Sequence, residues 1–88
     1  MKFKINKNVL WKVVDNEVVL VNSKNDEYSY LNTTGAEVWQ MIAEGVSQSE
    51  IVKKLSGEYD TSPETIKKDI DAIIDDLIKS KLIAKHSA

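Results

Sequence analysis

The sequence contains no cysteine, one proline and one histidine among its 88 residues. Without cysteine the chain cannot form a disulfide, a thiolate nucleophile or a cysteine-based zinc site. The histidine, His86, lies two residues from the end of the chain, so no serine, histidine and acid can be assembled into a catalytic triad. We therefore expect a protein that is not an enzyme and that carries no metal or other cofactor.

Glycine is also scarce, and neither sign of charge dominates. Gly35, Gly45 and Gly57 are dispersed, each near the end of an expected helix, so they do not form a phosphate-binding loop. The 12 basic and 14 acidic residues give a net charge of -2, which does not attract a polyanion. We therefore expect no nucleic-acid partner.

Long apolar runs are absent as well. No stretch approaches the roughly 20 apolar residues of a membrane span, and residues 1–8 lack the apolar core of a signal peptide. We therefore expect a cytoplasmic protein without a membrane partner. An apolar share of 42% and a charged share of 30% are typical of a soluble globular protein. At this length we expect one domain over residues 1–88, with an ordered core at about 9–83.

The residues that are present fall into a pattern of strands followed by helices. Residues 9–14 and 18–21 are β-branched and aromatic and are separated by the turn-forming cluster Asp15-Asn16-Glu17, which predicts a hairpin. A second polar cluster precedes a third β-favouring segment, residues 27–31. The simplest arrangement is an antiparallel meander, with the second strand in the centre and the third strand at an edge.

The third strand passes directly into the first predicted helix. Thr34 and Glu37 have the spacing of a capping box, which predicts a helix over about residues 34–43 that ends near Gly45. We expect Trp39 to face the core. The sheet and the helices are therefore joined closely at this junction.

Two further helices have clear start signals. Ser47 and Glu50 form the capping box of a second helix, which should end between residues 57 and 59. The third begins with Ser62 as its cap and Pro63 at the first helical position, and should run to about residue 80.

The third helix carries two neighbouring stripes at helical spacing. The first is apolar, is expected to face the core, and consists of Ile66, Ile70, Ile73 and Leu77. The second widens the apolar flank toward the C-terminal half of the helix and consists of Lys67, Asp71, Ile74 and Ile78. Two interpretations are open, since this stripe can pack inside the domain or line a binding surface.

Pairs of carboxylates also occur on this helix, at Asp75-Asp76 and at Asp69 and Asp71. Neighbouring positions on a helix do not converge, so we expect a solvated face and not a catalytic pair. These acids would hold magnesium only if phosphate ligands came from elsewhere.

Three segments carry a family resemblance: the junction Y-L-N-T-T-G-A-E-V-W-Q-M-I-A-E-G, then S-Q-S-E-I-V-K-K-L, then D-I-D-A-I-I-D-D-L-I-K-S-K-L-I. The positions that carry it are Leu31-Asn32, Gly35, Trp39, Gly45, Glu50-Ile51, Leu55, Asp69-Ile70, Leu77 and Leu82-Ile83. In their joint order and spacing, over about residues 9–83, they resemble the PqqD-like family, the group of pyrroloquinoline quinone biosynthesis protein D.

The resemblance implies an α+β, winged-helix-like domain with a three-stranded antiparallel sheet followed by three helices. Such domains recognise the leader segment of a ribosomally synthesised precursor peptide and present it to a modifying enzyme, in many pathways a radical S-adenosylmethionine enzyme. In the family the leader adds as a strand to the third strand and lies in the groove between that strand and the third helix. Carried onto this chain, the residues that bind the leader are Tyr28, Ser29, Tyr30, Leu31, Lys67, Asp71, Ile74 and Ile78.

Two features leave alternatives open. Tyr28 and Tyr30 lie on one face of the third strand, where they can either pack on the sheet or contact the leader. The family commonly has glycine before the final apolar pair, where this chain has Lys81. The end of the third helix, and with it the placement of Leu82 and Ile83, therefore stays open.

Two other functions compete with leader recognition. The second and third helices could form a helix-turn-helix of a winged-helix DNA-binding module, but the third helix carries more acids than bases and would be repelled by phosphate. The free edge of the third strand could also pair with a second copy of the chain, which predicts a homodimer that added leader would dissociate.

Overall fold

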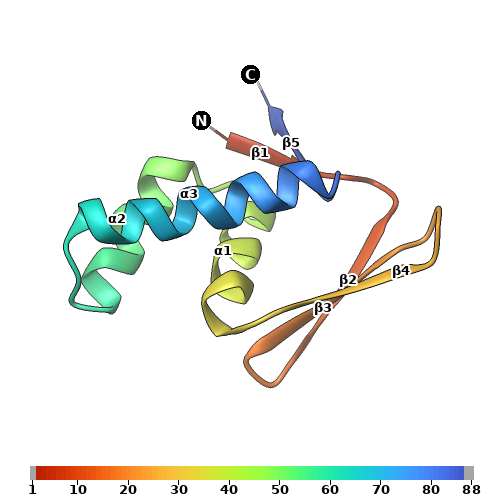
Figure 1. The fold of residues 1–88 in the computed structure, drawn as a ribbon, viewed down its shortest axis with the longest axis horizontal. Helices are drawn as coiled ribbons and strands as arrows, with labels where there is room; N and C mark the ends of the chain where they lie inside the picture. Colours follow the sequence, from red (N-terminus) through yellow and green to blue (C-terminus); the bar gives the residue numbers. More distant parts are fainter. Residues whose placement is uncertain (1, 87–88) are drawn as a thin grey trace.

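A computed structural model describes residues 2–86, in which two small antiparallel sheets and three helices enclose one core (Figure 1). The predicted fold class, α+β with a three-stranded antiparallel sheet followed by three helices, is confirmed. The elements in chain order are β1 (Lys2–Ile5), β2 (Val9–Val14), β3 (Glu17–Asn22), β4 (Glu27–Leu31), α1 (Thr33–Ala43), α2 (Gln48–Glu58), α3 (Pro63–Lys79) and β5 (Ile83–His86).

The three-stranded sheet has the predicted order, β2-β3-β4, with β3 in the centre. Val14 pairs with Glu17, so Asp15 and Asn16 form a two-residue turn between β2 and β3. Asp15 has a φ of 57°, a left-handed conformation that aspartate tolerates because its short side chain can hydrogen-bond locally. The sequence prediction of an antiparallel meander is therefore confirmed.

One face of this sheet closes the core. Val18 and Leu20 of β3 are fully buried, as are Val38 and Trp39 of α1, which packs against β3. Trp11 of β2 meets the Trp39 ring edge to face, with the ring centroids 6.1 Å apart. Burial of a large apolar side chain stabilises the fold by about 1.5–3 kcal/mol, so these contacts fix the sheet on α1.

The first helix starts at a different cap from the predicted one. Asn32 is the N-cap residue, and its side-chain oxygen accepts a hydrogen bond from the backbone N–H of Gly35 at 3.2 Å. The capping-box prediction for Thr34 and Glu37 is therefore wrong. Asn32 follows the last residue of β4 while its backbone is still extended, so it satisfies the free N–H group before Thr34 is reached.

The caps of the other two helices agree with the sequence prediction. The hydroxyl of Ser47 accepts a hydrogen bond from the N–H of Glu50 at 3.4 Å, and the hydroxyl of Ser62 accepts one from the N–H of Thr65 at 3.3 Å. Pro63 occupies the first helical position of α3. These starts depend on local chemistry alone, which explains why the sequence located them.

Lys81 takes the place of a helix-ending glycine. Its φ is 61°, and its N–H donates to the carbonyl of Ile78 while the N–H of Leu82 donates to Leu77. The same bonding pattern ends α1 at Gly45, whose φ is 82°. The lysine therefore adopts the left-handed conformation that glycine adopts more easily, and α3 ends at Lys79, close to the predicted residue 80.

The second sheet lies outside the predicted set of elements. β1 and β5 pair antiparallel, with Ile5 opposite Ile83 and Phe3 opposite Lys85. Phe3 is buried, so the core begins before the predicted range 9–83, whereas at the other end it stops at Ile83 and only the exposed part of β5 lies beyond the range. Figure 1 shows β1 and β5, from opposite parts of the sequence, lying side by side. Neither strand is stable alone, and each has its partner at the opposite end of the chain.

Candidate functional site

The open edge of β4 is the first candidate binding feature. Of the strands in the described part of the chain, β4 pairs with β3 alone, so one row of its N–H and C=O groups has no partner strand. An unpaired edge of this kind is a template for another extended chain. The strand also passes directly into α1, which fixes its position relative to the helices.

Tyr28 and Tyr30 project from the outer face of the sheet. Their exposed fractions are 69% and 71%, so they do not pack into the core. The register places Tyr28 opposite Val21 and Tyr30 opposite Val19, and places Leu10 of β2 beyond Val21 on the same face. This outer face therefore exposes a continuous apolar surface along the β4 edge.

Ser29 and Leu31 point to the other face of β4, toward the core. Both are half-buried, and Leu31 packs against the hydrophobic core. A Cβ atom at Gly35 would lie 3.3 Å from the Cβ of Leu31, so glycine permits the close approach of α1 to the end of β4. The two faces of β4 thus differ: one is fixed by packing and the other is open.

The four α3 residues predicted to bind a leader have three different environments. The ammonium of Lys67 lies 2.7 Å from a carboxylate oxygen of Asp71, whose other oxygen accepts a hydrogen bond from the side chain of Gln48 on α2. Ile74 is 2% exposed and belongs to the core. Ile78 is half-buried and lines a pocket together with β1 and β5.

Three residues of the predicted core stripe of α3, Ile66, Ile70 and Leu77, are buried, and the fourth, Ile73, is only partly buried. Ile74 of the second stripe is buried with them, so of the two open interpretations this residue follows packing inside the domain. The helix is therefore turned so that the middle of its apolar face lies nearer the second predicted stripe. Because both neighbouring stripes of the helix contain isoleucines, the sequence pattern alone does not show which stripe lies deepest in the core.

The flank of α3 that carries Lys67, Asp71 and Ile78 borders α2 and the two-stranded sheet. Lys67 and Asp71 lie beside Gln48, and Ile78 lies beside β1 and β5. β4 instead continues into the start of α1. From the helical period, Asp69, Ile73 and Asp76 lie on the opposite flank of α3. Leader contact by the α3 residues stays a prediction.

The sequence reasoning missed the participation of β2 and β3 in the exposed apolar surface. Leu10 is 62% exposed, and Val19 and Val21 are half-buried. A small hollow of about 160 Å³ lies on this face beside Tyr28. The signal was present, since β3 carries apolar residues on both of its faces, but only the register shows which of them adjoin β4.

Glu37, Glu58 and Tyr59 form the one place where pKa values are clearly perturbed among residues 2–86. The Tyr59 hydroxyl donates a hydrogen bond to Glu37 at 2.7 Å, which raises the pKa of Tyr59. The negative charge of Glu37 also raises the pKa of the exposed Glu58. The contact joins the end of α2 to α1 on the surface, which is a structural link and not a catalytic arrangement.

Over residues 2–86, no group of histidine and acidic side chains lies close enough together to hold a metal ion. In that part of the chain no helix has the length and apolar character needed to cross a membrane.

Solved structures of the same fold exist. TbiB1 in complex with the TbiA(beta) leader peptide matches with a TM-score of 0.89 at 27% sequence identity, covering 100% of both chains. A lasso peptide synthetase B1 complexed with the leader peptide matches with a TM-score of 0.88 at 24% identity, covering 97% of this chain and 100% of that chain. No curated protein sequence matches the chain.

A family model described as Coenzyme PQQ synthesis protein D (PqqD) matches residues 17–83. The matched range runs from the start of β3 to the first residue of β5 and contains β4 and all three helices. It thus includes the open strand edge and the helix that the sequence resemblance singled out. Because the match covers well over half of its length, the chain belongs to the PqqD family.

Proposed function

We propose that this chain is a non-catalytic binding protein that recognises the leader segment of a ribosomally synthesised precursor peptide and presents it to a modifying enzyme. The observation that carries the proposal is the open edge of β4 beside the exposed Tyr28 and Tyr30. The two solved structures of the same fold also support the proposal, because their names record a bound leader peptide.

Addition of a strand at β4 provides affinity through the backbone. The strand has five residues, and an antiparallel partner uses the N–H and C=O groups on its open side. A backbone hydrogen bond contributes a net of about 0.5–1.5 kcal/mol. Roughly four or five such bonds, together with burial of a few leader side chains, are enough for micromolar binding after the cost of association.

The side chains of the leader determine the specificity of binding. Alternate leader residues would lie next to Tyr28 and Tyr30 on the outer face, where aromatic and β-branched side chains form favourable cross-strand pairs. The residues between them would face the side of Ser29 and Leu31. A leader with apolar residues at every second position therefore fits this edge best.

The second part of the proposal concerns contacts between the leader and α3. Lys67, Asp71, Ile74 and Ile78 are the residues expected from the family resemblance. Ile74 is buried, so it offers no surface to a peptide while α3 keeps its present position. We propose to test both flanks with two double variants of polar residues, Lys67→Ala with Asp71→Ala, and Asp69→Ala with Asp76→Ala. The flank that faces the leader is the one whose pair weakens binding.

The modifying enzyme follows from the family resemblance and is proposed to be a radical S-adenosylmethionine enzyme in the cytoplasm. This chain would supply no cofactor and no catalytic group to it. The test is whether the complex of this chain with a leader binds such an enzyme more tightly than either component alone. If leader alone bound the enzyme as tightly as the complex does, this chain would have no role in presenting the leader.

The experiment that tests the proposed function is a titration of the full, isotope-labelled chain followed by amide NMR. The probe is the leader segment of a short precursor peptide encoded beside this protein, and duplex DNA serves as the parallel arm. We expect leader to shift the amides of residues 27–31 at low salt and at high salt alike. If leader shifts no amide, while DNA causes salt-sensitive shifts along α2 and α3, leader recognition is rejected in favour of the DNA-binding alternative.

Proline variants test strand addition directly. Successive N–H groups of a strand point to opposite sides, so of Ser29→Pro and Tyr30→Pro one removes a bond to β3 and the other removes only a donor on the open edge. Circular dichroism identifies the variant that keeps its fold. We expect that variant to bind leader about tenfold more weakly or worse. Parent affinity in a folded edge variant would rule out strand addition at β4.

The same edge allows a homodimer in the absence of leader. Two copies of β4 can pair antiparallel, because each exposes the same unpaired groups. In that case added leader should lower the hydrodynamic size measured by light scattering. A dimer that keeps its size while peptide is bound would show that the two use different surfaces.

A further inference from the structure

The charges of this chain are segregated along the sequence. All 14 acidic residues lie between Asp15 and Asp76, where they outnumber five lysines. The remaining seven lysines of the 12 lie in residues 2–12 and 79–85, where there is no carboxylate side chain. The formal side-chain charge is therefore +7 for the two ends together and -9 for the part between them.

The fold joins the two basic ends. β1 pairs with β5, and the side-chain amide of Asn6 donates a hydrogen bond to the carbonyl of Lys81 at 3.0 Å. The N–H of Asn6 also donates to the carbonyl of Leu82 at 2.9 Å. Lysines that are far apart in the sequence thus share one end of the molecule.

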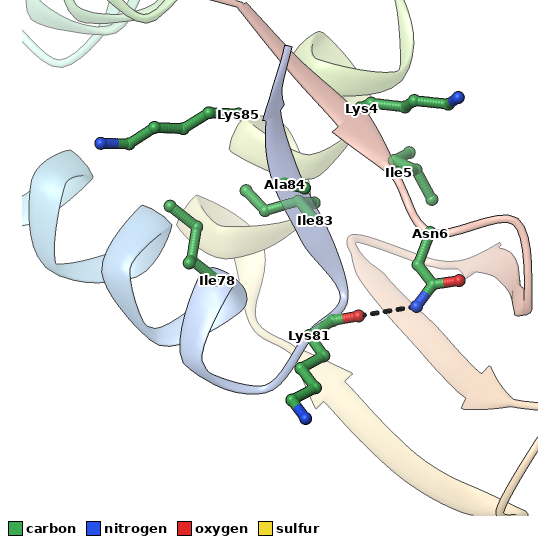
Figure 2. Close-up of a pocket in the computed structure, with 8 residues that line it drawn as sticks. All are labelled: Lys4, Ile5, Asn6, Ile78, Lys81, Ile83, Ala84 and Lys85. Carbon is green, nitrogen blue, oxygen red and sulfur yellow. Dashed lines mark hydrogen bonds between the residues drawn. The ribbon is translucent and has the colours of Figure 1, made fainter.

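An apolar pocket opens within this basic end. It has a volume of about 520 Å³ and lies between the C-terminal turn of α3 and the two-stranded sheet. Its floor is formed by Ile5, Ile78 and Ile83. Figure 2 shows the side chains of Lys4, Lys81 and Lys85 extending away from this floor in three directions, and among residues 2–86 no acidic side chain lines the pocket.

We propose that this pocket binds an acidic segment of a second partner protein, in which one or two bulky apolar residues are flanked by aspartate or glutamate. The apolar residue would enter the space above Ile5, Ile78 and Ile83, and the flanking carboxylates would meet the lysine ammonium groups. The inference goes beyond leader recognition, because it assigns a separate surface and a separate occupant.

Two observations favour a polypeptide from a second protein. A nucleic acid has phosphates but no apolar side chain to fill a pocket of this size. Its phosphates would contact the lysines and leave the apolar floor of the pocket empty. The precursor peptide is proposed to lie on β4, which continues into α1, whereas the pocket adjoins β1 and β5. A protein that presents one peptide to another protein needs two such surfaces at once.

The test uses the labelled full chain and two synthetic octapeptides, GEELFEEG and its neutral counterpart GQQLFQQG. We expect the acidic peptide to shift the amides of residues 4–6, 78 and 81–85, and to bind about tenfold more tightly than the neutral one at low salt. Raising the salt concentration to about 0.5 M should remove most of that difference, since exposed charges are then screened. Equal affinity for the two peptides would overturn the proposal.

Matched variants locate the binding surface. Lys4→Glu with Lys85→Glu should weaken acidic-peptide binding about tenfold, whereas Lys53→Glu with Lys54→Glu on α2, which changes the net charge equally, should leave it unchanged. Lys81→Gly serves as the variant that cannot fail by unfolding, because glycine favours the left-handed backbone at this position. It should weaken binding about threefold. If the α2 control lost as much affinity for the acidic peptide, the effect would come from net charge alone and the proposed site would be overturned.

Two further arms decide the class of partner and separate this inference from leader recognition. The acidic peptide should leave the leader affinity unchanged at saturation; competition would assign the pocket to the precursor and overturn the proposal. A single-stranded oligonucleotide or vesicles with phosphatidylserine that shift the same amides at lower concentration than the peptide would also overturn it. If leader shifts β4 while the acidic peptide shifts nothing, only this inference fails. If leader shifts nothing while the acidic peptide shifts the pocket, only the proposed function fails.

Discussion

The side-chain amide of Asn6 donates a hydrogen bond to the carbonyl oxygen of Lys81 across 75 positions of the sequence, at a distance of 3.0 Å. This bond fixes Lys81, two residues beyond the end of α3, against the residue that follows β1. Lys81 has a φ of 61°, so the backbone at this junction is held in a conformation that costs a residue with a side chain about 1–2 kcal/mol.

Lys81→Gly should therefore stabilise the protein. Glycine adopts the left-handed conformation without the steric cost, and the hydrogen bond from Asn6 is kept because its acceptor is the backbone carbonyl. We expect a gain of about 0.5–1 kcal/mol and a rise in Tm of about 2–8 °C, measured by thermal denaturation. Lys79→Gly, inside α3, is the control and should lower the Tm. Lower stability of Lys81→Gly would contradict the assigned end of the helix.

The cap of α1 distinguishes two starts of that helix. Asn32→Ala removes the acceptor of the Gly35 N–H and should cost about 1 kcal/mol of unfolding free energy. Thr34→Ala, which would be the damaging change if the capping box were correct, should cost less than about 0.5 kcal/mol. Urea denaturation of both variants measures the difference. A larger loss for Thr34→Ala would restore the capping box.

Ile74 tests the orientation of α3. Ile74→Asp puts an unpaired charge into the core, and we expect it to destabilise the protein by more than about 3 kcal/mol. Lys67→Ala, which breaks only a surface ion pair, should cost less than about 1 kcal/mol. Both values come from chemical denaturation. A folded Ile74→Asp variant of near-parent stability would show that this side of α3 is open.

The outer face of the sheet tests which strand edge binds leader. Tyr30→Thr should leave stability nearly unchanged, because the ring is 71% exposed, and should weaken leader binding about two- to fivefold. Val14→Thr removes an exposed apolar side chain from the outer face of β2, away from the apolar surface around Tyr28, and should not change the affinity. Isothermal titration calorimetry measures both. Loss of affinity in Val14→Thr alone would move the site to β2.

The neighbouring carboxylates of Glu37 on α1 and Glu58 at the end of α2 predict a pH dependence of stability. The charge of Glu37 raises the pKa of Glu58 above its usual value of 4.5, so the folded state holds this proton more tightly than the unfolded state. The resulting stabilisation is present below pH 4.5 and is lost as the pH rises through the folded-state pKa. Glu58→Gln should therefore raise the Tm at pH 7.

The control for this prediction is a double-mutant cycle. In a Glu37→Gln background the repulsion is already absent, so Glu58→Gln should no longer change the Tm. The benefit of the single variant should also disappear well below pH 4.5, where the Glu58 carboxyl is protonated and carries no charge. An equal benefit at both pH values would mean that the effect is not electrostatic.

The sequence by itself determined the elements whose causes are local. The hairpin at Asp15-Asn16, the helix starts at Ser47 and Ser62, and β4 as an edge strand follow from turn chemistry, capping and strand order. The spacing of its motifs also identified the family, since that spacing records how the elements are joined. Membership in the PqqD family was the functional information that needed no coordinates.

Only the tertiary structure decided the features that depend on distant partners. The pairing of β1 with β5 brings together residues from both ends of the chain, and no local pattern encodes it. The rotation of α3, which buries Ile74 and leaves Ile73 only partly covered, is set by packing against α2 and the core. The left-handed backbone of Lys81 is likewise imposed by its bonds, against the preference of the residue itself. Local propensities amount to tenths of a kcal/mol per residue, whereas each buried side chain contributes about 1.5–3 kcal/mol, so packing prevails where the two disagree.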